Sequence, residues 1–145
     1  MYKRQAILLP QLEELEDNIK AWNTRYDSLV DGLEQSGKII VPPRPKAEEY
    51  VGSSIQFQLD LATEQAEKFL HTCAQGGIEL KWFGATTPHG FTSRYDSWRY
   101  FENLPQLPQT EKILHRTFDM RIPLTFSVSD CKTLAQNLCI IAANF

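Results

Sequence analysis

The chain has 145 residues, enough for one domain with a sizeable core. Hydrophobic residues form 42% of the sequence and charged residues 23%, as in ordinary water-soluble globular proteins. The net charge is −3, and the sequence has no basic stripe of the kind found in nucleic-acid binders. Its apolar runs are far shorter than the ~20 residues that cross a bilayer, and too short for a signal peptide. We therefore expect a cytoplasmic protein that binds neither nucleic acid nor a membrane.

A long helix is the first predicted element. Apolar residues recur at alternating intervals of three and four, at Leu12, Leu15, Ile19, Trp22, Tyr26, Leu29 and Leu33. This spacing predicts one helix over residues 11–36, ~39 Å long, with an apolar seam as narrow as that of a coiled coil. Pro10 should begin its regular part or kink it, and Gly37 should end it. Because this seam is longer than one small domain, we expect part of it to pack against another domain or subunit.

Three short strands are predicted beyond a stiff, proline-rich connector at residues 41–50. Apolar residues at alternate positions indicate strands around residues 51–59, 78–82 and 118–124. Pro123 should mark the end or the edge of the last strand, because proline cannot donate to a ladder.

Three further helices are expected between and after these strands. Their signals are Asp60 or Thr63 as an N-cap, Gly76-Gly77 as a stop, Pro108 in a first turn before buried Ile113 and Leu114, and Ser127 with Asp130 as a capping box. The order of elements predicts a two-layer α+β domain, in which a small, mainly antiparallel sheet carries helices on one face. We divide the chain into a long helix at 1–40, the connector at 41–50 and a small domain at 51–145.

One irregular stretch, residues 84–106, shows neither helical nor strand periodicity. Its aromatic residues are costly to leave in water, so we expect a binding loop rather than disorder. Arg94 and Arg99 have the planar fork that grips carboxylate or phosphate. The alternative is that these arginines pair with Asp96 or Glu102 and simply pin the loop.

No other catalytic or metal-binding set is recognisable. Cys73, Cys131 and Cys139 lack the Cys-x-x-Cys spacing of zinc and redox sites, and we expect the first two to be buried, unreactive thiols. The three histidines form no metal set with them. Ser129 and Lys132 spell Ser-x-x-Lys without the companion motifs of a serine β-lactamase, and no glycine-rich phosphate loop is found.

Several segments, taken in order, resemble the DegT/DnrJ/StrS family of pyridoxal-phosphate (PLP) aminotransferases. They are Gln5–Glu13, Arg25-Tyr26, Leu33–Pro45, Gly76-Gly77-Ile78, Leu107–Ile113, Arg121–Leu124 and Ser127–Asn144. Together they cover nearly the whole chain, and their order and spacing carry the resemblance rather than any single motif. The chain departs from the family at Lys81-Trp82, where a histidine–aromatic pair is usual, and in the stretch from Gly84 to Tyr100.

The resemblance implies the C-terminal, substrate-side domain of a fold type I aminotransferase. An N-terminal domain would hold PLP in the intact parent, a homodimer that transfers an amino group to a small-molecule substrate such as a nucleotide-linked keto sugar. The segments that would hold PLP are not in this sequence, so we expect the fragment alone to bind no cofactor and to be inactive. Since the small domain of such enzymes contacts substrate, the expected substrate-binding residues are Lys81, Trp82, His89, Arg94 and Arg99, with no catalytic or metal-binding residue.

Two other hypotheses stay open. The chain could be a stand-alone, non-catalytic module whose aromatic and arginine-rich loop binds an anionic small molecule. It could also be a purely structural oligomerisation domain driven by the long helix.

Overall fold

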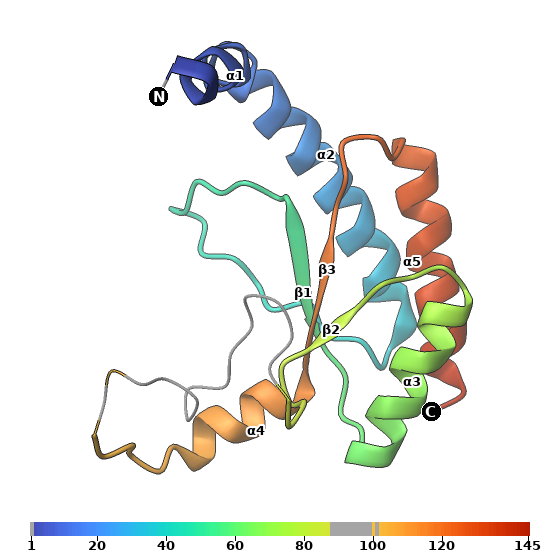
Figure 1. Cartoon of the computed structure of the whole chain (residues 1–145). Coiled ribbons are helices and arrows are strands. Elements are labelled where there is room, and N and C mark those ends of the chain that lie inside the picture. The colour runs from blue at the N-terminus through green and yellow to red at the C-terminus, as the bar shows by residue number, and fades with distance from the viewer. Residues whose placement is uncertain (1, 88–99, 101) are drawn as a thin grey trace.

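The computed structural model describes residues 2–87, 100 and 102–145 of the chain (Figure 1). The helices are α1 (Tyr2–Glu13), α2 (Leu15–Leu33), α3 (Thr63–Gln75), α4 (Pro108–Arg116) and α5 (Val128–Ala143), and a 3₁₀ turn covers Glu34–Ser36. The strands are β1 (Ser54–Gln58), β2 (Lys81–Trp82) and β3 (Thr117–Arg121), and they form an antiparallel sheet of order β1-β3-β2. The predicted α+β class with a small antiparallel sheet is confirmed.

The long N-terminal helix is divided in two, which corrects the prediction of one helix over residues 11–36. Pro10 lies inside α1, and the division falls at Glu14, whose φ of −93° and ψ of 0° depart from helical values. Hydrogen bonds still cross the junction, because the Glu14 N–H donates to the Pro10 carbonyl at 3.2 Å. Figure 1 shows α1 turned away from the line of α2. Gly37, with a left-handed φ of 67°, ends the 3₁₀ turn that follows α2, as predicted.

Only the C-terminal half of the predicted apolar seam is buried in this domain. Leu33 is 0% and Leu29 1% exposed, whereas Leu15 is 42% and Leu12 55% exposed. The buried half packs on α5 so closely that a Cβ placed on Gly32 would lie 2.5 Å from the Ala135 Cβ. The seam therefore forms core at one end and an exposed apolar surface at the other.

The sheet has one apolar and one polar face, as the alternating strand patterns predicted. Phe57 lies opposite Phe118 in the register, and their rings stack with centroids 5.6 Å apart. These side chains share one core with buried residues of α2, α3 and α5. Those three helices lie together on one side of the sheet, and α4 lies near one end of it (Figure 1).

The helix ends follow the sequence signals in most cases. Ser127 and Asp130 form the predicted capping box: the Ser127 hydroxyl accepts from the Asp130 N–H at 3.1 Å, and the Asp130 carboxylate accepts from the Ser127 N–H at 2.8 Å. Gly76 and Gly77 end α3, with Gly77 at a left-handed φ of 78°. The Ile78 N–H then donates back to the Cys73 carbonyl at 2.8 Å, which completes a Schellman motif.

Two expectations about the helices were wrong. The N-cap of α3 is Ala62, not Asp60 or Thr63, and the Gln65 side chain accepts from the Ala62 N–H at 3.1 Å. In α4 the first-turn proline is confirmed, but Ile113 is 50% exposed and Leu114 only half-buried. The helix lies near one end of the sheet rather than over its apolar face, so among the described residues the core does not cover these side chains fully (Figure 1).

Arg25 ties α2 to the segment between β3 and α5. Its guanidinium donates to the carbonyls of Phe126 at 2.6 Å and Leu124 at 3.1 Å, and within its own helix to Ala21 at 2.7 Å. Trp22, one turn earlier, donates its indole N–H to the Ile122 carbonyl at 3.0 Å. These bonds satisfy carbonyls that have left the β-ladder, and they fix the direction in which β3 runs into α5.

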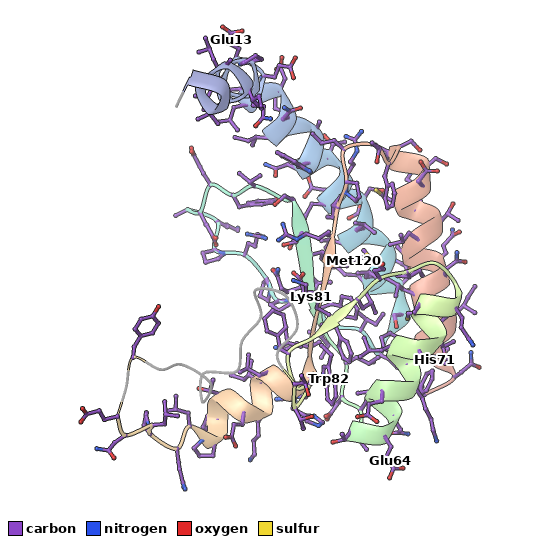
Figure 2. The ribbon with its side chains drawn as sticks, in the orientation of Figure 1. Glu13, Glu64, His71, Lys81, Trp82 and Met120 are labelled. Carbon is purple, nitrogen blue, oxygen red and sulfur yellow. The ribbon has the colours of Figure 1, made fainter. Side chains whose placement is uncertain are left out.

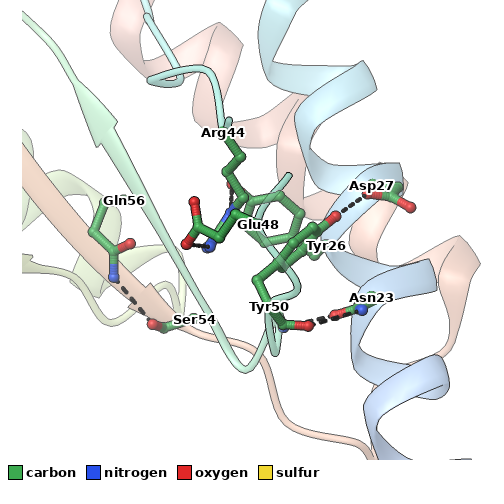
Figure 3. Close-up of polar contacts among 9 residues, drawn as sticks. Asn23, Tyr26, Asp27, Arg44, Glu48, Tyr50, Ser54 and Gln56 are labelled. Carbon is green, nitrogen blue, oxygen red and sulfur yellow. Dashed lines mark hydrogen bonds and ion pairs between the residues drawn. The ribbon is translucent and has the colours of Figure 1, made fainter. Parts of the chain in front are cut away.

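Tyr26 and Arg44 fasten the proline-rich connector to α2 (Figure 3). Arg44 lies over the rings of Tyr26 and Tyr50, 4.8 and 4.2 Å from the centroids, and its Nε donates to the Tyr26 hydroxyl at 3.2 Å. Tyr50 donates its own hydroxyl to Asp27 at 3.0 Å, and Asn23 donates to the Tyr50 carbonyl at the same distance. The connector is thus held as part of the domain before β1 begins.

Candidate functional site

An open cleft of about 640 Å³ lies where the β2–β3 ladder ends. Its walls are contributed by α3, the turn into β2, β3, and the start of α5. The lining residues are Leu70, His71, Ala74, Gly77, Ile78, Glu79, Leu80, Lys81, Asp119, Met120, Arg121, Pro123, Phe126 and Leu134. Figure 2 labels three of them, with Lys81 and Met120 on adjoining strands and His71 on the neighbouring helix.

The cleft exists because β2 is only two residues long. Lys81 pairs with Asp119 and Trp82 with Phe118, and the same register would next place Glu79 opposite Arg121. The ladder does not extend that far, because Ile78 is anchored elsewhere. Its N–H is bonded to the end of α3 and its side chain is 5% exposed, so the segment before β2 is held toward α3 and away from β3.

A polar row crosses the outer face of the sheet at the mouth of the cleft. Gln56, Asp119 and Lys81 occupy matched positions on β1, β3 and β2. The Gln56 side-chain amide donates to the Asp119 carboxylate at 2.6 Å, and Asp119 is 8% exposed. A carboxylate so deeply placed needs hydrogen-bond donors, and the Gln56 amide supplies one. Lys81 stands next to it, half-buried.

Trp82, the next residue of β2, points to the opposite, apolar face. It is 6% exposed, its ring lies parallel to that of Phe118 at 6.4 Å, and its indole N–H donates to the His115 carbonyl at 2.6 Å. The backbone approaches the indole so closely that a Cβ on Gly84 would lie 2.6 Å from the ring. Trp82 therefore holds β2 and the end of α4 against the core, and its predicted contact with substrate stays a prediction.

The predicted substrate-binding residues are placed only in part. Lys81 lines the cleft, and Trp82 lies behind it on the other face of the sheet. His89, Arg94 and Arg99 lie outside the described residues.

Sequence reasoning missed four polar residues of the cleft, His71, Glu79, Asp119 and Arg121. A signal for three of them, Glu79, Asp119 and Arg121, was present. Glu79 and Lys81 alternate on one predicted strand, and Asp119 and Arg121 alternate on another, so pairing the strands would have placed four charges together.

The cleft residues do not match what PLP requires. PLP needs a lysine for its aldehyde, an acid at its ring nitrogen and several donors around its phosphate. Lys81 is the one lysine among the residues that line the cleft, and of the two acids there, Asp119 and Glu79, the first already accepts from Gln56. The turn before β2 contains a glycine pair, but Gly77 serves as the helix stop of α3.

Other chemistry is not assembled in the described part of the chain. Among residues 2–87, 100 and 102–145, no three His, Cys, Asp or Glu side chains are grouped to hold a metal ion. Burial raises the pKa of the Cys73 thiol to about 12, and Cys131 is likewise buried with a raised pKa, so the expectation of buried thiols is confirmed. No helix of these residues combines the length and apolar character needed to cross a membrane.

No protein-family model and no curated protein matches the sequence. Solved structures do match the fold. The aminotransferase TlmJ from Streptoalloteichus hindustanus is 15% identical with a TM-score of 0.73, over 92% of this chain and 34% of that chain. This chain has the fold of one part of such aminotransferases.

Two more structures agree with this assignment of fold. A DegT DnrJ EryC1 StrS aminotransferase from Brucella abortus has a TM-score of 0.70 at 14% identity, over 93% of this chain and 34% of its own. The structure of DesI in the presence of its TDP-sugar product has a TM-score of 0.71 at 15% identity, over 92% and 33%. The chain therefore spans about a third of the length of the aminotransferases it resembles.

Proposed function

We propose that this chain is the C-terminal, substrate-side part of a PLP-dependent aminotransferase. The observation that carries the proposal is a likeness of fold that covers 92–93% of this chain but 33–34% of each aminotransferase. The order of the family-like segments along the sequence supports the C-terminal position. PLP would be held by another part of the intact protein, where it would supply the electron sink for moving an amino group.

Large apolar side chains are exposed on α1 and at the start of α2, and this supports contact with another domain of the intact protein. We name this surface the N-terminal stripe: Ile7, Leu8, Leu9, Leu12 and Leu15, which are 42–64% exposed. Large apolar side chains that gather on one surface mark sites of contact with another protein part. We propose that the PLP domain of the intact, homodimeric protein covers the stripe, because Leu12 and Leu15 belong to the seam whose other end lies in this domain's core.

For the substrate we propose a nucleotide-linked keto sugar. One structural neighbour, DesI, was solved with a TDP-sugar product, and the cationic residues predicted here suit the phosphates of such a molecule. Lys81, His89, Arg94 and Arg99 would bind these phosphates, while Trp82 keeps β2 in place beneath Lys81. In this scheme the chain binds and orients substrate and performs no proton transfer of its own.

The direct test joins the chain to the coding sequence that flanks it in its genome. We expect the joined product to bind PLP and to transfer an amino group to a nucleotide-linked keto sugar. Arg94→Gln and Arg99→Gln should raise KM for that substrate, whereas Lys132→Met, an exposed change on α5, should not. A flanking sequence that encodes no PLP domain would overturn the proposal.

The N-terminal stripe also favours a second candidate, an oligomerisation module without catalytic role. In that case Leu12→Ser with Leu15→Ser would abolish assembly of the chain in sedimentation experiments. Arg94 and Arg99 could then be changed without any effect on function.

A further inference from the structure

The open end of the β2–β3 ladder leaves backbone groups directed into the cleft. In an antiparallel ladder, residue pairs that are hydrogen-bonded to each other alternate with pairs that are not. Here Phe83 and Thr117 are a hydrogen-bonded pair, because the Phe83 N–H donates to the Thr117 carbonyl at 3.0 Å. Lys81 and Asp119 are the next hydrogen-bonded pair. If the ladder continued, Glu79 and Arg121 would be the hydrogen-bonded pair after that. No hydrogen bond joins Glu79 and Arg121 in the described part of the chain. On β3 the Ile122 N–H bonds to the Ser53 carbonyl of the β1 side, so the N–H and C=O of Arg121 point to the other side, toward the cleft, and are available to a ligand.

The cleft has an apolar floor and a charged mouth. Met120 is buried, and the half-buried side chains of Leu70, Leu80, Phe126 and Leu134 pack against the core beside it. At the mouth, the cations Lys81 and Arg121 lie on the polar face with Glu79 and Asp119.

The charges at the mouth favour a ligand with a single negative charge. Asp119 already accepts from Gln56 at 2.6 Å, so its lone pairs are partly engaged. Lys81 and Arg121 have no hydrogen bond or ion pair within the described chain, and Arg121 is exposed. Two carboxylates beside two cations leave no net charge, which disfavours a phosphate dianion. The backbone N–H of Arg121 adds a donor for an oxygen acceptor.

Pairing with a second copy of this chain fits the open edge less well. A two-fold arrangement centred on Arg121 would place two arginines opposite each other, which is destabilising. Shifting the centre brings Pro123 into a bonded position, where it has no N–H to give.

We propose that this cleft binds a small organic carboxylate with an apolar body. The carboxylate accepts from the side chains of Lys81 and Arg121 and from the Arg121 backbone N–H, while the apolar body covers Leu70, Met120 and Leu134. A volume of about 640 Å³ is in the ordinary range for small-molecule sites, roughly 300–1,000 Å³. The site is complete within this chain, so it does not depend on the proposed role in amino transfer.

The test is an NMR titration of the purified chain with 4-phenylbutyrate, with 4-phenylbutan-1-ol as the neutral match. We expect the acid to shift the backbone amides of Glu79 and Arg121, and to bind more tightly than the alcohol. Lys81→Met and Arg121→Gln should each weaken binding of the acid about three- to tenfold. Lys132→Met and Arg116→Gln, which remove the same charges outside the cleft, should leave it unchanged.

Several results would overturn this site. They are equal affinity for acid and alcohol, shifts that map to the N-terminal stripe, or unchanged affinity in both cleft variants. Circular dichroism of each variant separates lost binding from lost folding, and the acid–alcohol comparison on the unaltered chain needs no variant at all. Whether the acid binds or not, the result leaves open the separate question of whether the parent protein transfers an amino group.

Discussion

The crossing of α2 and α5 gives the sharpest prediction about the fold. A Cβ on Gly32 would lie 2.5 Å from the Ala135 Cβ, about 1 Å inside the normal separation of roughly 3.5–4.0 Å between carbon atoms. Gly32→Ala therefore forces two packed helices apart, and such overpacking costs about 1–3 kcal/mol. The change also gains about 1 kcal/mol of helix propensity. We expect a net loss of up to about 2 kcal/mol in the free energy of unfolding.

A double-mutant cycle isolates the clash from helix propensity. Ala135→Gly removes the methyl group that the new side chain meets, so the clash is absent when both changes are made. The coupling energy from urea unfolding should be at least about 1 kcal/mol, with the pair more stable than the sum of the single changes. Additive effects, or a Gly32→Ala variant that is more stable than the unaltered chain, would refute the close helix crossing.

Three further predictions concern single side chains. Arg25→Lys should lower the free energy of unfolding by about 1–2 kcal/mol, measured in urea, because an ammonium cannot serve the carbonyls of Leu124 and Phe126 as the guanidinium fork does. The capping hydrogen bonds from Ser127 lower the pKa of Asp130. At neutral pH the unaltered chain should therefore be more stable than Asp130→Asn, and this difference in the free energy of unfolding should disappear as the pH falls through the lowered pKa. A difference that stays constant down to acid pH would contradict the cap. In the native protein at pH 8, iodoacetamide should modify half-buried Cys139 well before Cys73, whose pKa of about 12 and complete burial protect it, and mass spectrometry of digests would show the order.

Local signals in the sequence predicted most elements of the fold. The capping box at Ser127, the glycine stop after α3 and the first-turn proline of α4 depend on neighbouring residues alone, and all three are confirmed. The seam of the long helix was read correctly, but its division at Glu14 was not, because the hydrophobic period continues unbroken across that residue. The exposed position of Ile113 was missed, since periodicity gives the face of a helix and not what covers it.

The candidate site was harder to predict, because it depends on a ladder that fails to extend. Lys81 was identified through family resemblance, yet its neighbours Arg121 and Glu79 come together only through the register of β2 on β3. The length of β2 follows from the anchoring of Ile78 at the end of α3, a tertiary effect without a local pattern. Strand alternation places Trp82 on the face opposite Lys81, and its predicted contact with substrate stays a prediction.

Absorbance spectroscopy of the purified 145-residue chain with PLP tests the account most directly. We predict no stable band of a protein aldimine. After borohydride reduction, peptide mapping should find at most scattered, substoichiometric labelling of exposed lysines. One lysine labelled in nearly every molecule, above all Lys81, would contradict the claim that the cofactor is held by a part of the protein outside this chain.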